Sequence, residues 1–386
     1  MPRCPVPASR SHPAPRWATR LPAALALTLL AGCAGLGESV GYYWQSVRGH
    51  VLLMQAARPV GDWLADEQAS AALKARLALA QRIRDYAVTT LHLPDNASYR
   101  RYADLQRPAA VWNVVAAPAL SLELKTWCFP VTGCVGYRGY FAEADARAEA
   151  ARLQAEGLEV SVYGVPAYST LGWLNWVGGD PLLNTFIHYP EGELARLVFH
   201  ELAHQVVFVA DDTMFNESFA TAVERLGSAR WLTEQASPAA RAEYAAFDAR
   251  RTAFRALTLA TRRQLAAIYP KSEQNQAVAS ADAGVLAMKS EAMQHFRQQY
   301  AALKAGWGGF AGYDGWVARA NNAAFGAQAA YDNLVPGFEA LFAREGHDWP
   351  RFYDAVKQLA ALPRPERHLR LQHPVPAPTN EETPGA

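Results

Sequence analysis

The sequence has few cysteines and almost no net charge, and both facts exclude classes of protein. Its 386 residues include four cysteines, and 37 Lys and Arg nearly balance 36 Asp and Glu, which leaves a formal net charge of +1. A disulfide-rich scaffold is therefore excluded. Because no basic stripe follows the first twenty residues, we expect no nucleic-acid partner. Hydrophobic residues make up 51% of the chain, which is enough for a large core in one to three domains.

The apolar run near the N-terminus is too short to cross a bilayer. Leu21–Leu30 has ten residues, about half of what a transmembrane helix needs. A positive region precedes it, and Leu30-Ala31-Gly32-Cys33 follows, which resembles a bacterial lipobox. We therefore expect residues 1–32 to be a lipoprotein signal peptide. The positive region contains Arg3, Arg10, Arg16 and Arg20.

Lipidation of Cys33 would anchor the mature chain to a membrane. By resemblance to lipoproteins of Gram-negative bacteria, Ala34 in place of Asp favours the outer membrane, with the body of the protein facing the periplasm. Three acyl chains exceed the two signals that stable anchoring requires. The alternative is an ordinary secretory signal with an unrelated cysteine.

Two cysteines remain for the body of the protein once Cys4 is cleaved and Cys33 is lipidated. Cys128 and Cys134 bracket a turn-rich loop, Phe-Pro-Val-Thr-Gly. In an oxidising compartment we expect a disulfide between them. It would close about seven residues and contribute about 2 kcal/mol to stability in the chain-entropy model. A pair of reduced thiols is the alternative.

The motif with the clearest chemistry is His200-Glu201-Leu202-Ala203-His204, inside an apolar run from Leu197 to Val209 that predicts a buried helix. Four residues make about one helical turn, so His200 and His204 project from the same face and can share one ion. Two imidazoles suit zinc, and Glu201 lies beside the face where water would react. A catalytic zinc needs a third protein ligand.

Glu217 is the predicted third ligand. The short polar residues Asp211-Asp212-Thr213 predict a break followed by the N-cap of a second helix. His204 and Glu217 are nearly equidistant from that break, so they would stand at the same height in an antiparallel helix pair. Glu224, seven residues further on, would lie on the same face and orient an imidazole.

The alternative to a metal site is a buried helix with two hydrogen-bonded histidines in the core. Three such groups on converging apolar faces are costly to desolvate without a partner ion. The sequence therefore favours a metal site with one position left open for chemistry.

The remaining pattern predicts an α+β fold that is mainly helical. A metal-helix hairpin of the zincin type would be preceded by a small mixed sheet and followed by a helical C-terminal region. The expected segments are a helical region over 33–106, an α/β and metal-helix core over 107–235, a helical region over 236–362, and a disordered tail over 363–386.

Strand patterns are confined to the middle of the chain. We expect strands over Ala110–Ala117 and Leu158–Val165, a hairpin over Trp127–Phe141, and a helix over Ala142–Glu156. A further strand is expected over Ala167–Trp173. Within it, Ser169–Trp173 is the candidate edge for binding an extended peptide, although these residues could merely pack in a sheet. Tyr331 is a candidate oxyanion donor, with core packing as its alternative.

Asn216-Glu217-Ser218-Phe219-Ala220 resembles the second metal helix of the gluzincin metallopeptidases, particularly the aminopeptidase N type. Over nearly the whole mature chain, the sequence is similar to a family of bacterial proteins identified from sequence as zinc aminopeptidases. This resemblance implies a Zn²⁺ peptidase acting on a peptide substrate. The segments that carry it, besides the metal helices, are Trp112–Pro118, Trp127–Pro130, Tyr137–Phe141 and Ala167–Trp173.

Two features depart from the aminopeptidase N type. The connector between His204 and Glu217 is shorter, and no G-x-M-E-N segment is present to bind a substrate amino terminus. Glu143 could supply that anion, or could be a first-turn helix residue. We therefore expect a zinc metallopeptidase, most simply an aminopeptidase. The alternatives are an endopeptidase or other amide hydrolase on the same site, and a non-catalytic lipoprotein with a structural zinc.

Overall fold

The computed structural model describes residues 41–129, 133–170, 178–270, 283–328 and 334–373. The chain divides into two compact units, Met1–His50 and Val51–Ala386. In the first, residues 41–50 are helical, whereas Cys33 and the expected signal peptide lie outside the described residues. No helix within the described ranges is long and apolar enough to span a bilayer.

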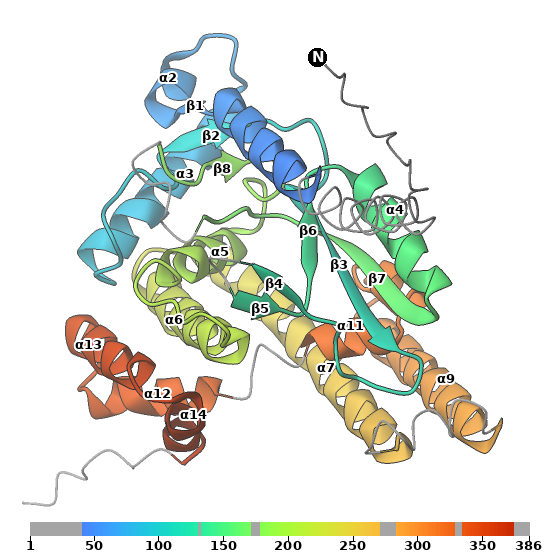
Figure 1. The fold of residues 1–386 in the computed structure, drawn as a ribbon. Coiled ribbons are helices and arrows are strands. Elements are labelled where there is room, and N and C mark those ends of the chain that lie inside the picture. Colours follow the sequence, from blue (N-terminus) through green and yellow to red (C-terminus); the bar gives the residue numbers. More distant parts are fainter. Residues whose placement is uncertain (1–40, 130–132, 171–177, 271–282, 329–333, 374–386) are drawn as a thin grey trace, which may run out of the picture. The chain divides into compact units, whose positions relative to one another are not determined.

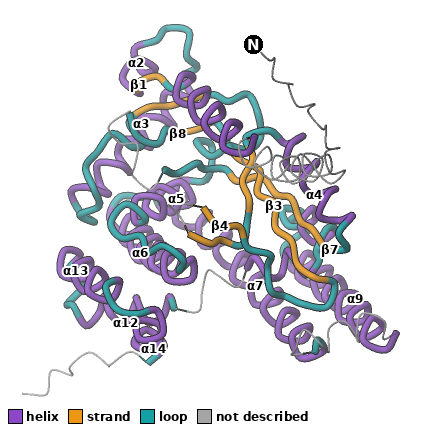
Figure 2. The backbone as a smooth tube through the Cα atoms, viewed as in Figure 1, coloured by secondary structure: helices purple, strands orange, loops and turns teal. Residues whose placement is uncertain are grey.

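The second unit is an α+β fold in which helices dominate, as the sequence predicted. Figure 1 shows long helices surrounding short strands, and Figure 2 shows how little of the backbone is strand. In the described part of the chain, the strands form two three-stranded sheets and one hairpin.

The first sheet pairs three very short strands in the order β1-β2-β8, namely Arg58–Pro59, Arg101–Ala103 and Leu182–Leu183. The short helix α2 (Val60–Ala65) and the long helix α3 (Ala71–Thr89) separate the first two. Ser70 caps α3 by accepting a hydrogen bond from the backbone of Leu73, as short polar side chains do at this position. Residues 33–106 were expected to be helical, so the strands β1 and β2 correct that prediction.

The second sheet has the order β6-β3-β7, with β3 (Val111–Pro118) antiparallel to both β6 (Arg138–Tyr140) and β7 (Leu158–Val165). The strands predicted over Ala110–Ala117 and Leu158–Val165 are thereby confirmed. Helix α4 (Glu143–Ala155) packs against β3 and β7, and so does α11 (Asn322–Ala327). Val115 and Ala117 of β3 are fully buried in a cluster with Ala323 of α11.

The hairpin predicted over Trp127–Phe141 is present in its first part, as β4 (Trp127–Phe129) and β5 (Gly133–Val135), whereas Arg138–Tyr140 is β6 and pairs with β3 instead. Cys128 and Cys134 are cross-strand partners and form the expected disulfide.

Two long helices carry the predicted metal ligands. Helix α5 (Glu191–Ala203) packs against α6 (Thr213–Glu234), and Gly227 allows a close approach. A Cβ at Gly227 would lie 2.7 Å from Leu91 and 3.1 Å from Phe199. The helix predicted over 197–209 is displaced, because the observed one begins six residues earlier and ends at Ala203.

The connector after α5 is held by a side chain from α6. The side chain of Asn216 donates to the Val209 carbonyl (2.7 Å) and accepts from the Val209 N–H (2.8 Å). These bonds hold the backbone of the connector away from a helical path, since both groups would otherwise bond within a helix.

The C-terminal region is helical, as predicted. Helices α7 (Pro238–Ile268) and α9 (Ala283–Gly306) pack together, and α10 (Asp314–Ala318) and α11 adjoin them around an aromatic core. Three further helices follow: α12 (Val335–Arg344), α13 (Trp349–Ala360) and α14 (Arg364–Gln372).

Helix α14 shows that the prediction of a disordered tail over 363–386 is wrong for residues 364–372. Arg367 is 6% exposed and donates to the buried Asp212 at 2.7 Å. His368 Nε2 lies 2.9 Å from the same carboxylate. Composition indicated disorder, but Arg367 and His368 share one buried partner, Asp212, which lies 155 and 156 residues earlier in the sequence.

The predicted peptide-binding strand over Ser169–Trp173 is not observed where the structure describes it. Residues 167–170 have no regular structure, and 171–173 lie outside the described residues. The Thr170 N–H donates to the carboxylate of Asp180 instead of to a neighbouring strand (3.0 Å to Oδ1). Asp180 is 1% exposed, so this side chain competes successfully for a backbone group that a strand would need.

Candidate metal centre

Three side chains from α5 and α6 converge on one point. His200 Nε2 lies 3.2 Å from His204 Nε2 and 3.3 Å from Glu217 Oε2, and His204 Nε2 lies 3.9 Å from Glu217 Oε1. One ligand atom from each of the three falls within 4.8 Å of the others. The residues predicted as metal ligands are therefore brought together, and the group can hold a metal ion.

The spacing of these atoms fits a small tetrahedral ion. Two ligand nitrogens that each lie about 2.0–2.1 Å from such an ion are about 3.4 Å apart. The two histidine nitrogens, 3.2 Å apart, and the His200–Glu217 pair, 3.3 Å apart, are close to that value, whereas the His204–Glu217 pair is wider at 3.9 Å. Two imidazole nitrogens that face each other without an ion can share at most one proton, so a shared cation satisfies both better.

The backbone that positions His204 and Glu217 differs from the antiparallel helix pair that the sequence predicted. Helix α5 ends at Ala203, and His204 is its C-cap residue with φ −58° and ψ −22°. Because these angles are still helical, the one-turn spacing from His200 survives at the helix end. Nine residues, 204–212, then separate the two helices, and Glu217 is the fifth residue of α6. His204 and Glu217 are therefore not brought together by standing at equal distances from the turn of a symmetric helix pair.

Glu224 orients His200, as the sequence predicted. Its Oε2 lies 3.1 Å from His200 Nδ1, so the imidazole can donate there while Nε2 points to the other two ligands. Arg196 donates to the second oxygen of Glu224. Burial raises the pKa of Glu224, but Arg196 and His200 outweigh it and lower the value to about 2.

Arg196 was missed by the sequence analysis. It lies one helical turn before His200 on α5 and reaches α6 to pair with Glu224. A basic residue four positions before a metal-binding histidine is a signal that could have been read, because i and i+4 residues share a helix face.

The two histidines are in opposite electrostatic situations. Burial lowers the pKa of His204 to about 4, in spite of the Glu217 carboxylate. Burial also lowers the pKa of His200, but hydrogen bonds to Glu217 and Glu224 outweigh that effect and raise it well above the ordinary value. His204 therefore offers a neutral nitrogen. The His200 ring instead favours its protonated form, because a carboxylate lies at each of its two nitrogens.

Glu201 is placed for acid–base chemistry at neutral pH. Burial raises its pKa to about 7, and the charge of His200 opposes the shift. Glu217 and Asp180 raise this pKa further. A group whose pKa lies near the working pH can both accept and release a proton.

Ser169 is a second residue whose role the sequence analysis missed. Its hydroxyl hydrogen bonds to Glu201, and it lies 3.5 Å from the carboxylate of Asp180. Ser169 was expected in a strand, so its contact with the glutamate of the motif could not be anticipated from a period-two pattern.

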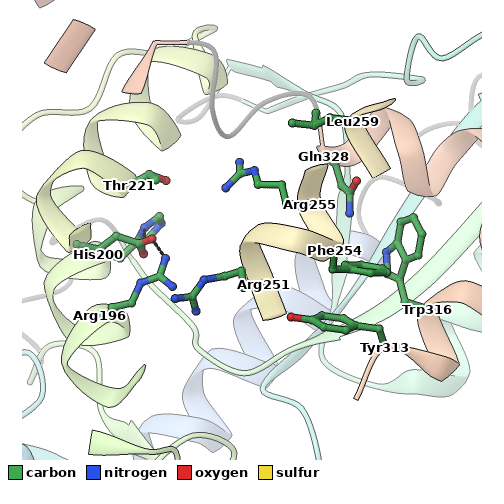
Figure 3. Close-up of a pocket in the computed structure, with 11 residues that line it drawn as sticks. Arg196, His200, Thr221, Arg251, Phe254, Arg255, Leu259, Tyr313, Trp316 and Gln328 are labelled. Carbon is green, nitrogen blue, oxygen red and sulfur yellow. Dashed lines mark hydrogen bonds and ion pairs between the residues drawn. The ribbon is translucent and has the colours of Figure 1, made fainter. Parts of the chain in front are cut away.

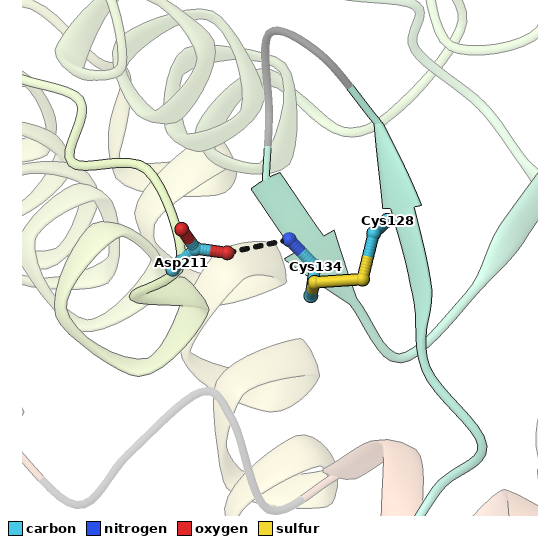
Figure 4. The surroundings of a disulfide bond; sticks show 3 residues. All are labelled: Cys128, Cys134 and Asp211. Carbon is cyan, nitrogen blue, oxygen red and sulfur yellow. Dashed lines mark hydrogen bonds between the residues drawn. A yellow bond between two sulfur atoms is a disulfide. The ribbon is translucent and has the colours of Figure 1, made fainter.

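The disulfide hairpin meets the connector between α5 and α6. Figure 4 shows the Asp211 carboxylate facing the backbone nitrogen of Cys134, and the two atoms are 2.6 Å apart. The cysteine pair therefore lies beside the segment that joins the two metal-ligand helices.

Glu143, the candidate for binding a substrate amino terminus, is not part of this cluster. Glu143 is in the first turn of α4, where it is partly exposed and pairs with Arg147 at 2.5 Å. The helical role considered for Glu143 is the one observed. Tyr331 lies outside the described residues.

Comparisons with known proteins agree with the geometry at the level of the family. Residues 41–371 match the family described as "Putative aminopeptidase". Searches of curated proteins and of solved structures each gave no match. Because the matched segment covers most of the 386 residues, the chain belongs to this aminopeptidase family.

Proposed function

We propose that this protein is a zinc-dependent peptidase of the aminopeptidase type. The observation that carries the proposal is the convergence of His200, His204 and Glu217, all within 4.8 Å of one another, with Glu201 one residue along the same helix. Four-ligand structural sites are closed, whereas this group has three protein ligands among the described residues. That ligand number is typical of catalytic zinc sites.

Each residue of the cluster would have a distinct role. His200, His204 and Glu217 would hold the zinc, which supplies Lewis-acid polarisation of a carbonyl and acidifies water. Glu201 would accept a proton from the attacking water and deliver it to the leaving amine. Its raised pKa of about 7 in the metal-free site means that it accepts and releases protons readily. Glu224 would keep His200 Nε2 turned towards the ion.

The cellular setting is a proposal from the sequence pattern alone. The segment that ends in Leu30-Ala31-Gly32-Cys33 supports lipidation at Cys33. The enzyme would then be anchored to a bacterial membrane, with the outer membrane favoured, and would act on peptide substrates in the periplasm.

Replacement of Glu201 by Gln tests the catalytic role. The variant Glu201→Gln removes only the base, so we expect it to keep its zinc and to lose at least about a thousandfold in kcat, within the range of general acid–base catalysis. The matched control is Glu191→Gln, the same change ten residues earlier on α5, where a Gln oxygen can still accept from Trp231 Nε1. Cleavage of a peptide library would be read by mass spectrometry.

The library also separates the alternatives. An aminopeptidase cleaves free but not N-terminally blocked peptides, and an endopeptidase cleaves both. If the wild type binds zinc and cleaves neither, the zinc is structural. If Glu201→Gln cleaves at the wild-type rate, the proposed mechanism is wrong.

A further inference from the structure

The two neighbouring functional side chains of α5 are held by different partners. His200 and Arg196, which lie side by side in the wall of a cavity (Figure 3), both contact Glu224 of α6. Glu201 is the next residue, and successive side chains of a helix point about 100° apart. Its carboxylate therefore faces a different part of the protein from the His200 imidazole.

Ser169 meets the Glu201 carboxylate. Its hydrogen bond lowers the pKa of Glu201, which is the effect of a hydroxyl that donates to the charged form of a carboxylate. A serine hydroxyl has only one proton to donate. The second carboxylate near Ser169 is that of Asp180, at 3.5 Å, which is the outer limit for a hydrogen bond. The Ser169 proton is therefore available to Glu201.

Asp180 fixes the backbone that carries Ser169. The Thr170 N–H, which belongs to the peptide group between Ser169 and Thr170, lies 3.0 and 3.1 Å from the two carboxylate oxygens of Asp180. Asp180 is 1% exposed, and a carboxylate buried so deeply needs hydrogen-bond donors. The Thr170 N–H supplies one, so the position of Ser169 is tied to that of Asp180.

Asp180 is anchored in turn by the segment that precedes β2. Its N–H donates to the Ser98 hydroxyl at 3.1 Å, and its carbonyl accepts from the Tyr99 N–H at 2.6 Å. The Ser98 hydroxyl also accepts from Gln205 Nε2 at 3.2 Å. Because Gln205 directly follows the C-cap residue of α5, these contacts tie the Asp180 segment back to the helix that carries Glu201.

The two carboxylates repel each other. The charge of Asp180 contributes to the raised pKa of Glu201, as expected for two nearby anions. A favourable link from Asp180 to Glu201 therefore has to pass through a hydrogen-bond donor. Ser169 supplies that donor, and Asp180 holds the donor in place.

We propose that Ser169, held in place by Asp180, is a positioning residue that fixes the Glu201 carboxylate in one orientation. Its catalytic consequence rests on the proposed function, in which Glu201 accepts a proton from water. A glutamate side chain has several rotamers, and a base must lie within about 2.6–3.2 Å of the group whose proton it accepts. A hydrogen bond to one carboxylate oxygen leaves the other free to accept that proton.

A double-mutant cycle on the zinc-free protein tests the contact without relying on activity. Ser169→Ala, Glu201→Ala and the double variant are compared by urea unfolding. We expect non-additive effects, because residues that share a hydrogen bond are coupled, whereas independent sites add. Ser161→Ala changes a serine of β7 that is also partly buried, and its combination with Glu201→Ala is the matched control, which should be additive. Additivity of Ser169→Ala and Glu201→Ala overturns the proposal.

Kinetics of the zinc-loaded enzyme test the consequence for catalysis. Ser169→Ala should keep its zinc and lower kcat about tenfold or more. KM should stay within about twofold, because the change removes an interaction that matters in the transition state and not in substrate binding. Ser169→Thr keeps the hydroxyl and should recover most of the lost kcat. A rise in KM alone, or a loss of kcat that Thr does not recover, contradicts the positioning role.

A change at Asp180 tests whether it acts through the same hydroxyl. Asp180→Asn leaves one acceptor oxygen in place of two, so it should hold the Thr170 N–H less firmly and lower kcat. Added to Ser169→Ala, it should cause little further loss, since both changes act on one chain of contacts. Losses that multiply in the double variant would show that Asp180 acts separately and would contradict its part in the proposal.

The unfolding and kinetic results separate this inference from the proposed function. Coupling between Ser169 and Glu201 in a protein that cleaves no peptide defeats the peptidase proposal and leaves the positioning contact intact. Additive unfolding effects in an active zinc peptidase do the opposite.

Discussion

Asp211 accepts a hydrogen bond from the backbone N–H of Cys134, with 2.6 Å between Asp211 Oδ1 and the nitrogen. This contact joins a hairpin closed by a disulfide to the connector between the helices that carry the predicted metal ligands (Figure 4). The fit is close, because a Cβ at Gly133 would lie 2.3 Å from the same oxygen. Gly133 also has φ +70°, which disfavours other residues.

The first prediction concerns this contact. Asp211 has φ +63°, a conformation that Asp and Asn tolerate better than Ala. Asp211→Ala should therefore lower the free energy of unfolding by about 1–2 kcal/mol, through loss of the hydrogen bond and backbone strain. Asp211→Asn keeps an acceptor oxygen and should stay within about 0.5 kcal/mol of the wild type. Urea unfolding measures both, and equal effects of Ala and Asn would contradict the role of this bond.

The second prediction concerns the pair that ties α14 to the start of α6. Arg367 and Asp212 are both buried, and removing one partner leaves an uncompensated charge. Arg367→Gln should destabilise the fold by about 2–4 kcal/mol, towards the low side because His368 also contacts Asp212. Arg370→Gln, an exposed change on the same helix, is the control and should have little effect. If the two variants had the same denaturation midpoint, the contact between α14 and the start of α6 would not stabilise the fold.

The third prediction concerns the orientation of His200. Glu224→Ala removes the acceptor at His200 Nδ1 and should weaken zinc binding by about 10–100-fold, as for other outer-shell partners of metal ligands. Glu193→Ala removes a partly buried carboxylate near Arg196 that does not touch either histidine, and should change the affinity much less. Competition with a chromophoric chelator gives both values. Zinc affinity that is insensitive to Glu224→Ala would refute the orienting role.

The fourth prediction concerns protons released on metal uptake. The pKa of metal-free His200 lies well above its ordinary value, so the ring is protonated at pH 7, and a ligand nitrogen must lose that proton. Zinc binding should therefore release about one proton, and the apparent affinity should fall about tenfold per pH unit below neutrality. Calorimetric titration in two buffers with different ionisation enthalpies measures the release. The same heat in both buffers would mean that His200 is neutral before binding.

Local patterns explain why much of the site could be predicted. The one-turn spacing of His200 and His204 depends only on helix geometry, and Asp212 caps α6 as its residue type indicates. Glu224 lies seven residues after Glu217, which returns to the same helix face. The strand runs around Val111–Pro118 and Leu158–Val165 were also readable from β-branched content alone.

Features that depend on distant partners could not be predicted in this way. Helix α14 is rich in charged residues, and one of them, Arg367, pairs with a carboxylate 155 residues earlier. The contact of Ser169 with Glu201 depends on how separate elements pack. Glu217 lies close to His200 and His204, as predicted, although the connector is nonhelical and the two helices do not form the symmetric hairpin that was expected.

The zinc content of the purified protein, measured by inductively coupled plasma mass spectrometry, tests the central claim most directly. The account predicts about one zinc per wild-type chain and almost none in His204→Ala, since two ligands cannot retain the ion through purification. An absence of zinc in the wild type, or equal zinc in wild type and His204→Ala, would contradict it.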